Sequence, residues 1–75
     1  MDTEQIMIRS LPTMTTEEIE TLVTSCCERG HGLHVILNEG PFILSGEDLR
    51  STWDDLAPGE TFRPTALLEP RATHH

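Results

Sequence analysis

The fold of this chain is decided by residues 15–45, TTEEIETLVTSCCERGHGLHVILNEGPFILS, where a helical pattern gives way to a strand pattern. Thr15 and Glu18 have the spacing of a capping box, in which a hydroxyl and a carboxylate satisfy the free amides at a helix start. Apolar residues then recur at i, i+3, i+4 and i+7 and form one stripe: Ile19, Leu22, Val23 and Cys26. The pattern predicts an amphipathic helix that ends at Gly30 or Gly32.

The second half of this stretch predicts a β-hairpin. Two apolar runs flank residues 38–40, and Gly40 can take the left-handed conformation that such a turn needs. Side chains alternate between the two faces of a strand, so Leu33 and Val35 share the core-facing side. His34 lies between them in the sequence and is therefore expected to face away from the core.

Working outward, two further strands and a second helix are expected. Residues 4–10 alternate in part between apolar and polar side chains, which predicts a strand. Residues 45–56 predict a helix with Ser45 as N-cap, whose apolar face carries Leu49, Trp53 and Leu56. Residues 61–70 can form a last short strand, although Pro64 should break it.

The fold class is therefore α+β, in one small domain that spans residues 1–75. The order β-α-β-β-α, with or without a final strand, matches the split β-α-β arrangement of ferredoxin-like proteins. Right-handed crossovers would place both helices on one face of a sheet of three or four strands. We expect an ordered core over about residues 4–69 and a frayed tail over residues 70–75, and interpret His74 and His75 as tag-derived.

The charge of the chain restricts its partners. It has 13 acidic residues and five basic ones, none of them lysine, and a formal net charge of −8. Direct binding to nucleic acid or to an anionic membrane needs Lys and Arg, so neither is expected. The sequence has no membrane-spanning run and no signal-peptide pattern at its start, which favours a cytoplasmic protein. An acidic surface instead favours a protein partner with a basic surface.

A cluster of potential metal ligands, residues 26–34, includes two cysteines and two histidines. Cys26 belongs to the apolar stripe and His34 to the outer face of a strand, which leaves Cys27 and His31 as the alternative zinc pair. Their spacing does not match a structural zinc site. Cys27 is also expected near a helix C-terminus, which disfavours a reactive thiolate. We therefore expect free thiols, no cofactor and no catalytic residue.

No catalytic motif is present, so an enzyme is not expected. The second predicted helix carries several carboxylates around one tryptophan, and these residues are the candidate partner-binding set: Glu47, Asp48, Trp53, Asp54 and Asp55. The hypothesis is a small acidic interaction module, of the kind encoded by bacteria and phages, that regulates or inhibits a basic partner. Its sharpest form is mimicry of nucleic acid. The alternative is a small-molecule or zinc-binding domain, and an exposed strand edge also favours a homodimer.

Overall fold

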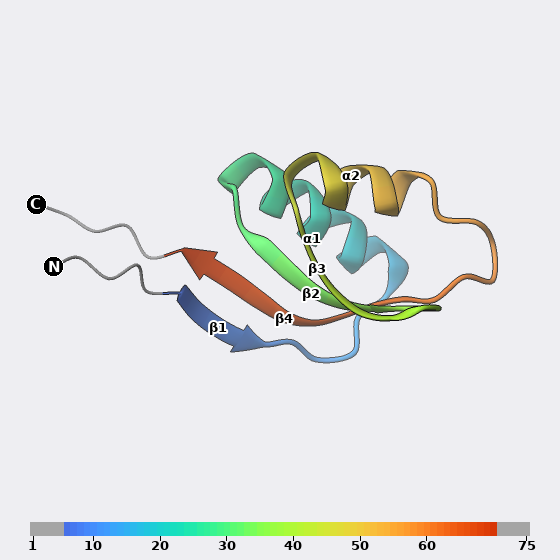
Figure 1. The fold of residues 1–75 in the computed structure, drawn as a ribbon, viewed down its shortest axis with the longest axis horizontal. Helices are drawn as coiled ribbons and strands as arrows, with labels where there is room; N and C mark the ends of the chain where they lie inside the picture. Colours follow the sequence, from blue (N-terminus) through green and yellow to red (C-terminus); the bar gives the residue numbers. More distant parts are fainter. Residues whose placement is uncertain (1–5, 71–75) are drawn as a thin grey trace, which may run out of the picture.

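Two helices lie on one face of a four-stranded sheet in the computed structural model, which describes residues 6–70 (Figure 1). Both helices lie above the sheet in that view, and no element of the described part of the chain lies over its other face. The predicted α+β class and the order of the elements are confirmed. The elements are β1 (Ile6–Ser10), α1 (Thr16–Arg29), β2 (Gly32–Leu37), β3 (Gly40–Ser45), α2 (Gly46–Asp54) and β4 (Phe62–Pro70).

The sheet has the strand order β1-β4-β2-β3, and every neighbouring pair is antiparallel. The β1-α1-β2 crossover passes over β4, and the β3-α2-β4 crossover passes over β2. Both crossovers are thus split β-α-β units, as expected. The order of the strands in the sheet differs from that of a ferredoxin-like sheet. Here β1 and β3 lie at the edges, whereas a ferredoxin-like sheet has its first and third strands at the centre.

Helix α1 begins and ends where its local sequence predicts. The Thr15 amide donates to Glu18 Oε1 over 2.8 Å, and the Glu18 amide donates to Thr15 Oγ1 over 3.2 Å. At the other end, Gly30 has a φ of 73°, and its amide donates to the Cys26 carbonyl. Gly30 rather than Gly32 therefore ends the helix, because a left-handed residue at this position closes the last turn.

The core lies between the two helices and the sheet. Val23, Leu33, Val35 and Leu49 are completely buried, and Cys26 is almost so. Helices α1 and α2 run antiparallel, since Cys27 near the end of α1 meets Gly46 at the start of α2. The predicted apolar stripe of α1 accordingly faces the core.

Strand β4 continues through Pro64, contrary to the expectation that this residue would break it. The register between β2 and β4 shifts between His34 and Val35, and Pro64 lies buried opposite Val35. Such an irregularity is one of the few places where a strand accepts a residue without an N–H. His34 lies on the opposite face from Val35, as predicted, and its Nδ1 lies 2.6 Å from Thr65 Oγ1.

Two expectations fall on residues that the structure leaves undescribed. The predicted first strand included residues 4 and 5, and the frayed tail included residues 71–75. These segments lie outside the described residues, whereas Pro70 is the last residue of β4.

Candidate protein-interaction site

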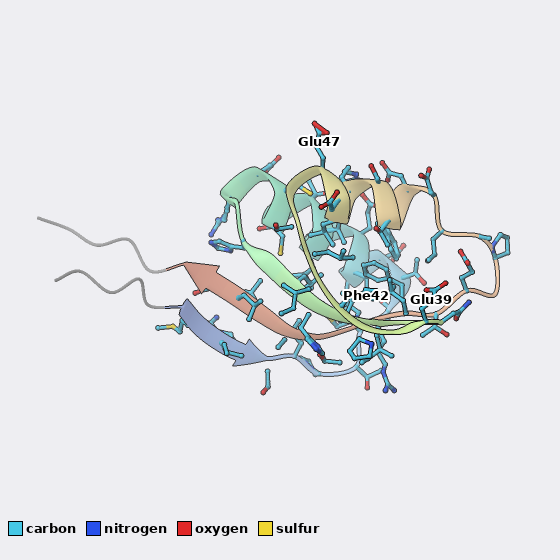
Figure 2. All side chains as sticks on the ribbon, in the orientation of Figure 1. Glu39, Phe42 and Glu47 are labelled. Carbon is cyan, nitrogen blue, oxygen red and sulfur yellow. The ribbon has the colours of Figure 1, made fainter. Side chains whose placement is uncertain are left out.

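Four carboxylates lie at the two ends of α2 (Gly46–Asp54), the last of them on the C-cap residue Asp55. Glu47 and Asp48 lie in the first turn and are exposed, and Figure 2 shows the Glu47 side chain projecting away from the sheet. Seven residues separate Glu47 from Asp54 and Asp48 from Asp55. A separation of seven residues returns to nearly the same side of a helix and advances about 10 Å along its axis. The backbone positions of each pair therefore lie about 10 Å apart along the helix axis.

Arg50 lies between the two helices and pairs with acids from both. Its Nη2 lies 2.7 Å from Asp54 Oδ1 and 3.3 Å from Glu20 Oε2. Its Nε donates to Asp54 Oδ2 over 3.0 Å, and its Nη1 donates to Thr24 Oγ1 over 3.2 Å. This bidentate contact gives Asp54 a fixed position and a partly neutralised charge.

These contacts change the acidity of the groups involved. Hydrogen bonds from the Trp53 indole and then from Arg50 lower the pKa of the Glu20 carboxyl. The Arg50 guanidinium lowers the pKa of Asp54 in the same way, and the pKa of Arg50 itself is raised. All three groups are therefore charged at neutral pH, and the cluster keeps a net charge of one carboxylate.

Trp53 is half-buried and held in place on two sides. Its Nε1 donates to Glu20 Oε1 over 2.5 Å. Its ring packs edge-on against Phe62, with 5.0 Å between the ring centroids and 64° between the planes. An aromatic side chain that is held in this way loses little conformational freedom when a partner covers it.

A groove of about 520 Å³ opens beside Trp53, between the start of α1 and the loop from α2 to β4. Ile19, Leu56 and Phe62 contribute apolar walls, and Asp54 and Glu60 contribute carboxylates. A smaller hollow of about 320 Å³ lies on the other side of Leu56 and Glu60, where Glu39 and Asp55 contribute to its lining. Figure 2 shows Glu39 at the hairpin end of the molecule, where this hollow lies.

The structure brings together part of the predicted site. Trp53 and Asp54 line the groove and Asp55 lines the adjacent hollow, whereas Glu47 and Asp48 lie at the far end of α2. Sequence reasoning missed several residues of the site: Glu20, Arg50, Glu60 and Phe62. The available signals were two i, i+4 spacings, Arg50 with Asp54 in the second helix and Glu20 with Thr24 in the first.

The alternative zinc pair is not part of a larger ligand cluster. Cys27 Sγ lies 3.5 Å from the Gly46 carbonyl oxygen. No three His, Cys, Asp or Glu side chains within residues 6–70 lie where together they could hold a metal ion. A structural zinc site needs four ligands, so the described residues do not fit one. Both cysteines are free thiols.

No protein-family model, curated protein or solved structure matches this chain. Within residues 6–70, neither helix is long and apolar enough to span a membrane.

Proposed function

We propose that this chain is a cytoplasmic interaction module that regulates or inhibits a partner protein with a basic surface. The observation that carries the proposal is the groove beside Trp53, which is lined both by apolar side chains and by two carboxylates. A lysine or arginine side chain of the partner can lay its aliphatic stem against the apolar side chains and pair its charged end with a carboxylate.

The charges around the groove support a cationic ligand. Arg50 already pairs with Glu20 and Asp54. Within the described residues, three other acids that line the groove or the adjacent hollow make no ion pair: Glu39, Asp55 and Glu60. Their negative potential would attract a basic partner and speed its association at low ionic strength.

Capture from a lysate of the source organism, followed by binding measurements with the captured protein, tests the proposal. The site variant neutralises the three acids at the groove and the adjacent hollow that form no ion pair: Glu39→Gln, Asp55→Asn and Glu60→Gln. A matched variant changes the net charge by the same amount at exposed acids that line neither the groove nor the hollow: Glu17→Gln, Glu28→Gln and Glu47→Gln. Glu47 lies at the opposite end of α2 from the groove.

We expect the site variant to lose at least about tenfold in affinity and the matched variant to lose less, because close charge pairs contribute more than distant ones. Equal losses in the two variants would mean that only net charge matters. Unchanged binding by the site variant would exclude this surface as the docking site.

The narrower form of the proposal is that the acidic surface replaces nucleic acid in the groove of its partner. The net charge of −8 supports it, as do the exposed carboxylates at both ends of α2. Duplex DNA or RNA should then compete with this chain for the captured partner. Simultaneous binding of both would rule out mimicry and leave the broader proposal intact.

A further inference from the structure

The sheet face opposite the helices is largely apolar, and no helix or strand within residues 6–70 covers it. The register of the four strands places one set of side chains on this face: Ile8, Ser10, His34, Ile36, Pro41, Ile43, Arg63, Ala66 and Leu68. Ile8 on β1 is 68% exposed and Ile43 on β3 is 66% exposed. Ile36, Ala66 and Leu68 on the central strands are half-buried. Two exposed isoleucines thus flank a strip of smaller apolar surface.

This face carries no carboxylate among residues 7–69, whose side chains the structure describes. The acids lie instead on the helices, at the hairpin turn and in the loop before β4. Glu69 lies on β4 but pairs with Met7 and shares the helix side, where its carboxylate lies 4.0 Å from Arg9. The open face carries one arginine, Arg63, and one histidine, His34. Charge is therefore segregated between the two faces.

Two polar side chains of the central strands, those of His34 and Thr65, are already hydrogen-bonded. His34 Nδ1 lies 2.6 Å from Thr65 Oγ1, and the Thr65 hydroxyl lies 3.3 Å from the His34 carbonyl oxygen, to which it can donate. A polar group that is hydrogen-bonded within the chain loses less favourable interaction energy when a partner displaces the water around it. Covering this face therefore leaves these two side chains satisfied.

We propose that a second copy of this chain covers the open face, with the two sheets packed against each other and the helices on the outside. Two chains with a net charge of −8 repel each other. Contact through the sheet face, which has no carboxylate among residues 7–69, keeps the carboxylates of the two copies farthest apart. Sheets that pack face to face lie about 10 Å apart, so each acidic helix layer would lie beyond its own sheet. The same patch serves on both copies, as a two-fold dimer requires.

The size of the face suits a weak dimer. Four strands at about 4.8 Å spacing and about six residues at about 3.3 Å give a sheet of about 400 Å² per copy before side-chain relief is counted. Burial on both copies is then on the order of 1,000 Å², at the lower end for specific interfaces. We therefore expect a dissociation constant in the micromolar range. A basic partner, as in the proposed function, does not fit a face that offers no carboxylate.

Sedimentation equilibrium of the full chain from about 10 μM to about 1 mM tests the proposal, since this range brackets a micromolar dissociation constant. The variant Ile43→Glu places a carboxylate on the open face at an exposed position, and Ile8→Glu does so on the other edge strand. Thr21→Glu adds the same charge on the exposed side of α1 and is the control. Circular dichroism checks that each variant folds.

We expect the wild type and Thr21→Glu to dimerise, and each isoleucine variant to dimerise at least about tenfold more weakly, because it buries an unpaired charge. A wild type that stays monomeric up to about 1 mM would overturn the proposal, since that range exceeds the expected constant. So would a dimer that is unaffected by both isoleucine variants, or one that Thr21→Glu disrupts equally. None of these results bears on the groove beside Trp53, so the two proposals can fail separately.

Discussion

Arg50 is the residue that links the two helices at the candidate site. It joins Glu20 of α1 to Asp54 of α2, and Glu20 in turn accepts the indole hydrogen bond of Trp53. The charged cluster thereby fixes the aromatic ring that forms one wall of the groove. A partner that docks there meets an already ordered surface, which lowers the conformational cost of binding.

We expect this cluster to make the stability of the fold depend on pH in the acidic range. Glu20 and Asp54 have lowered pKa values in the folded chain, so they stabilise the fold above their unfolded pKa values. That stabilisation is lost as the pH falls through the lower, folded pKa values. We expect the urea midpoint to fall in this acidic range, and to fall less in Arg50→Gln. Identical pH profiles for the two proteins would contradict the assignment.

The two adjacent cysteines should react at different rates. Burial raises the pKa of the Cys26 thiol, which is nearly inaccessible in the core, whereas Cys27 is half-buried. Because the exposed thiolate is the nucleophile, iodoacetamide should modify Cys27 first and Cys26 only after unfolding. Mass spectrometry of the native and urea-unfolded chain can count the labels. Equal labelling of both thiols in the native protein would show that Cys26 is not buried in solution.

At the scale of the elements, a side-chain cap stabilises the start of α1, and α2 has no such cap. Ser45 was predicted as the N-cap of α2 and takes an extended conformation there, but its hydroxyl makes no capping hydrogen bond. Helix α2 also ends at Asp54, earlier than the predicted Leu56. It therefore relies on the burial of Leu49 and on its contacts with α1.

Removal of the α1 cap should be measurable. Thr15→Ala deletes the hydroxyl that accepts from the Glu18 amide and should lower the free energy of unfolding by about 1 kcal/mol. In a domain of this size such a loss lowers the melting temperature by about 4–8 °C. Thr13→Ala, two residues earlier and exposed, is the control. Equal melting temperatures for the two variants would contradict the capping role.

The local sequence predicted the helices and strands well, but it could not predict contacts between residues that are far apart in the chain. Thr15, Glu18 and Gly30 mark both ends of α1 through contacts within a few residues. The strand order could not be predicted, because the position of β4 between β1 and β2 depends on partners far apart in the chain. For the same reason, only some residues of the candidate site could be predicted. Glu20 and Trp53 are 33 residues apart, and only the packing of the helices brings them together.

At the scale of the whole molecule, the acidic helix side and the carboxylate-free sheet face should respond to salt in opposite ways. Raising the ionic strength shortens the distance over which charges act. We expect added salt to weaken binding of a basic partner at the helix side and to leave self-association unchanged or stronger, since repulsion between two acidic chains is screened. Titration calorimetry and sedimentation at low and high salt can measure both. Weakening of both associations by salt would contradict the division into two surfaces.

The proposal that the groove beside Trp53 binds basic side chains is tested most directly by nuclear magnetic resonance. The ¹⁵N-labelled chain, which has a single tryptophan, is titrated with an arginine-rich peptide and with the same peptide carrying citrulline in place of arginine. The account predicts that the arginine peptide alone shifts the Trp53 indole signal and the amides around the groove, with little change on the sheet face. Shifts spread evenly over the acidic residues, with an unmoved indole signal, would contradict it.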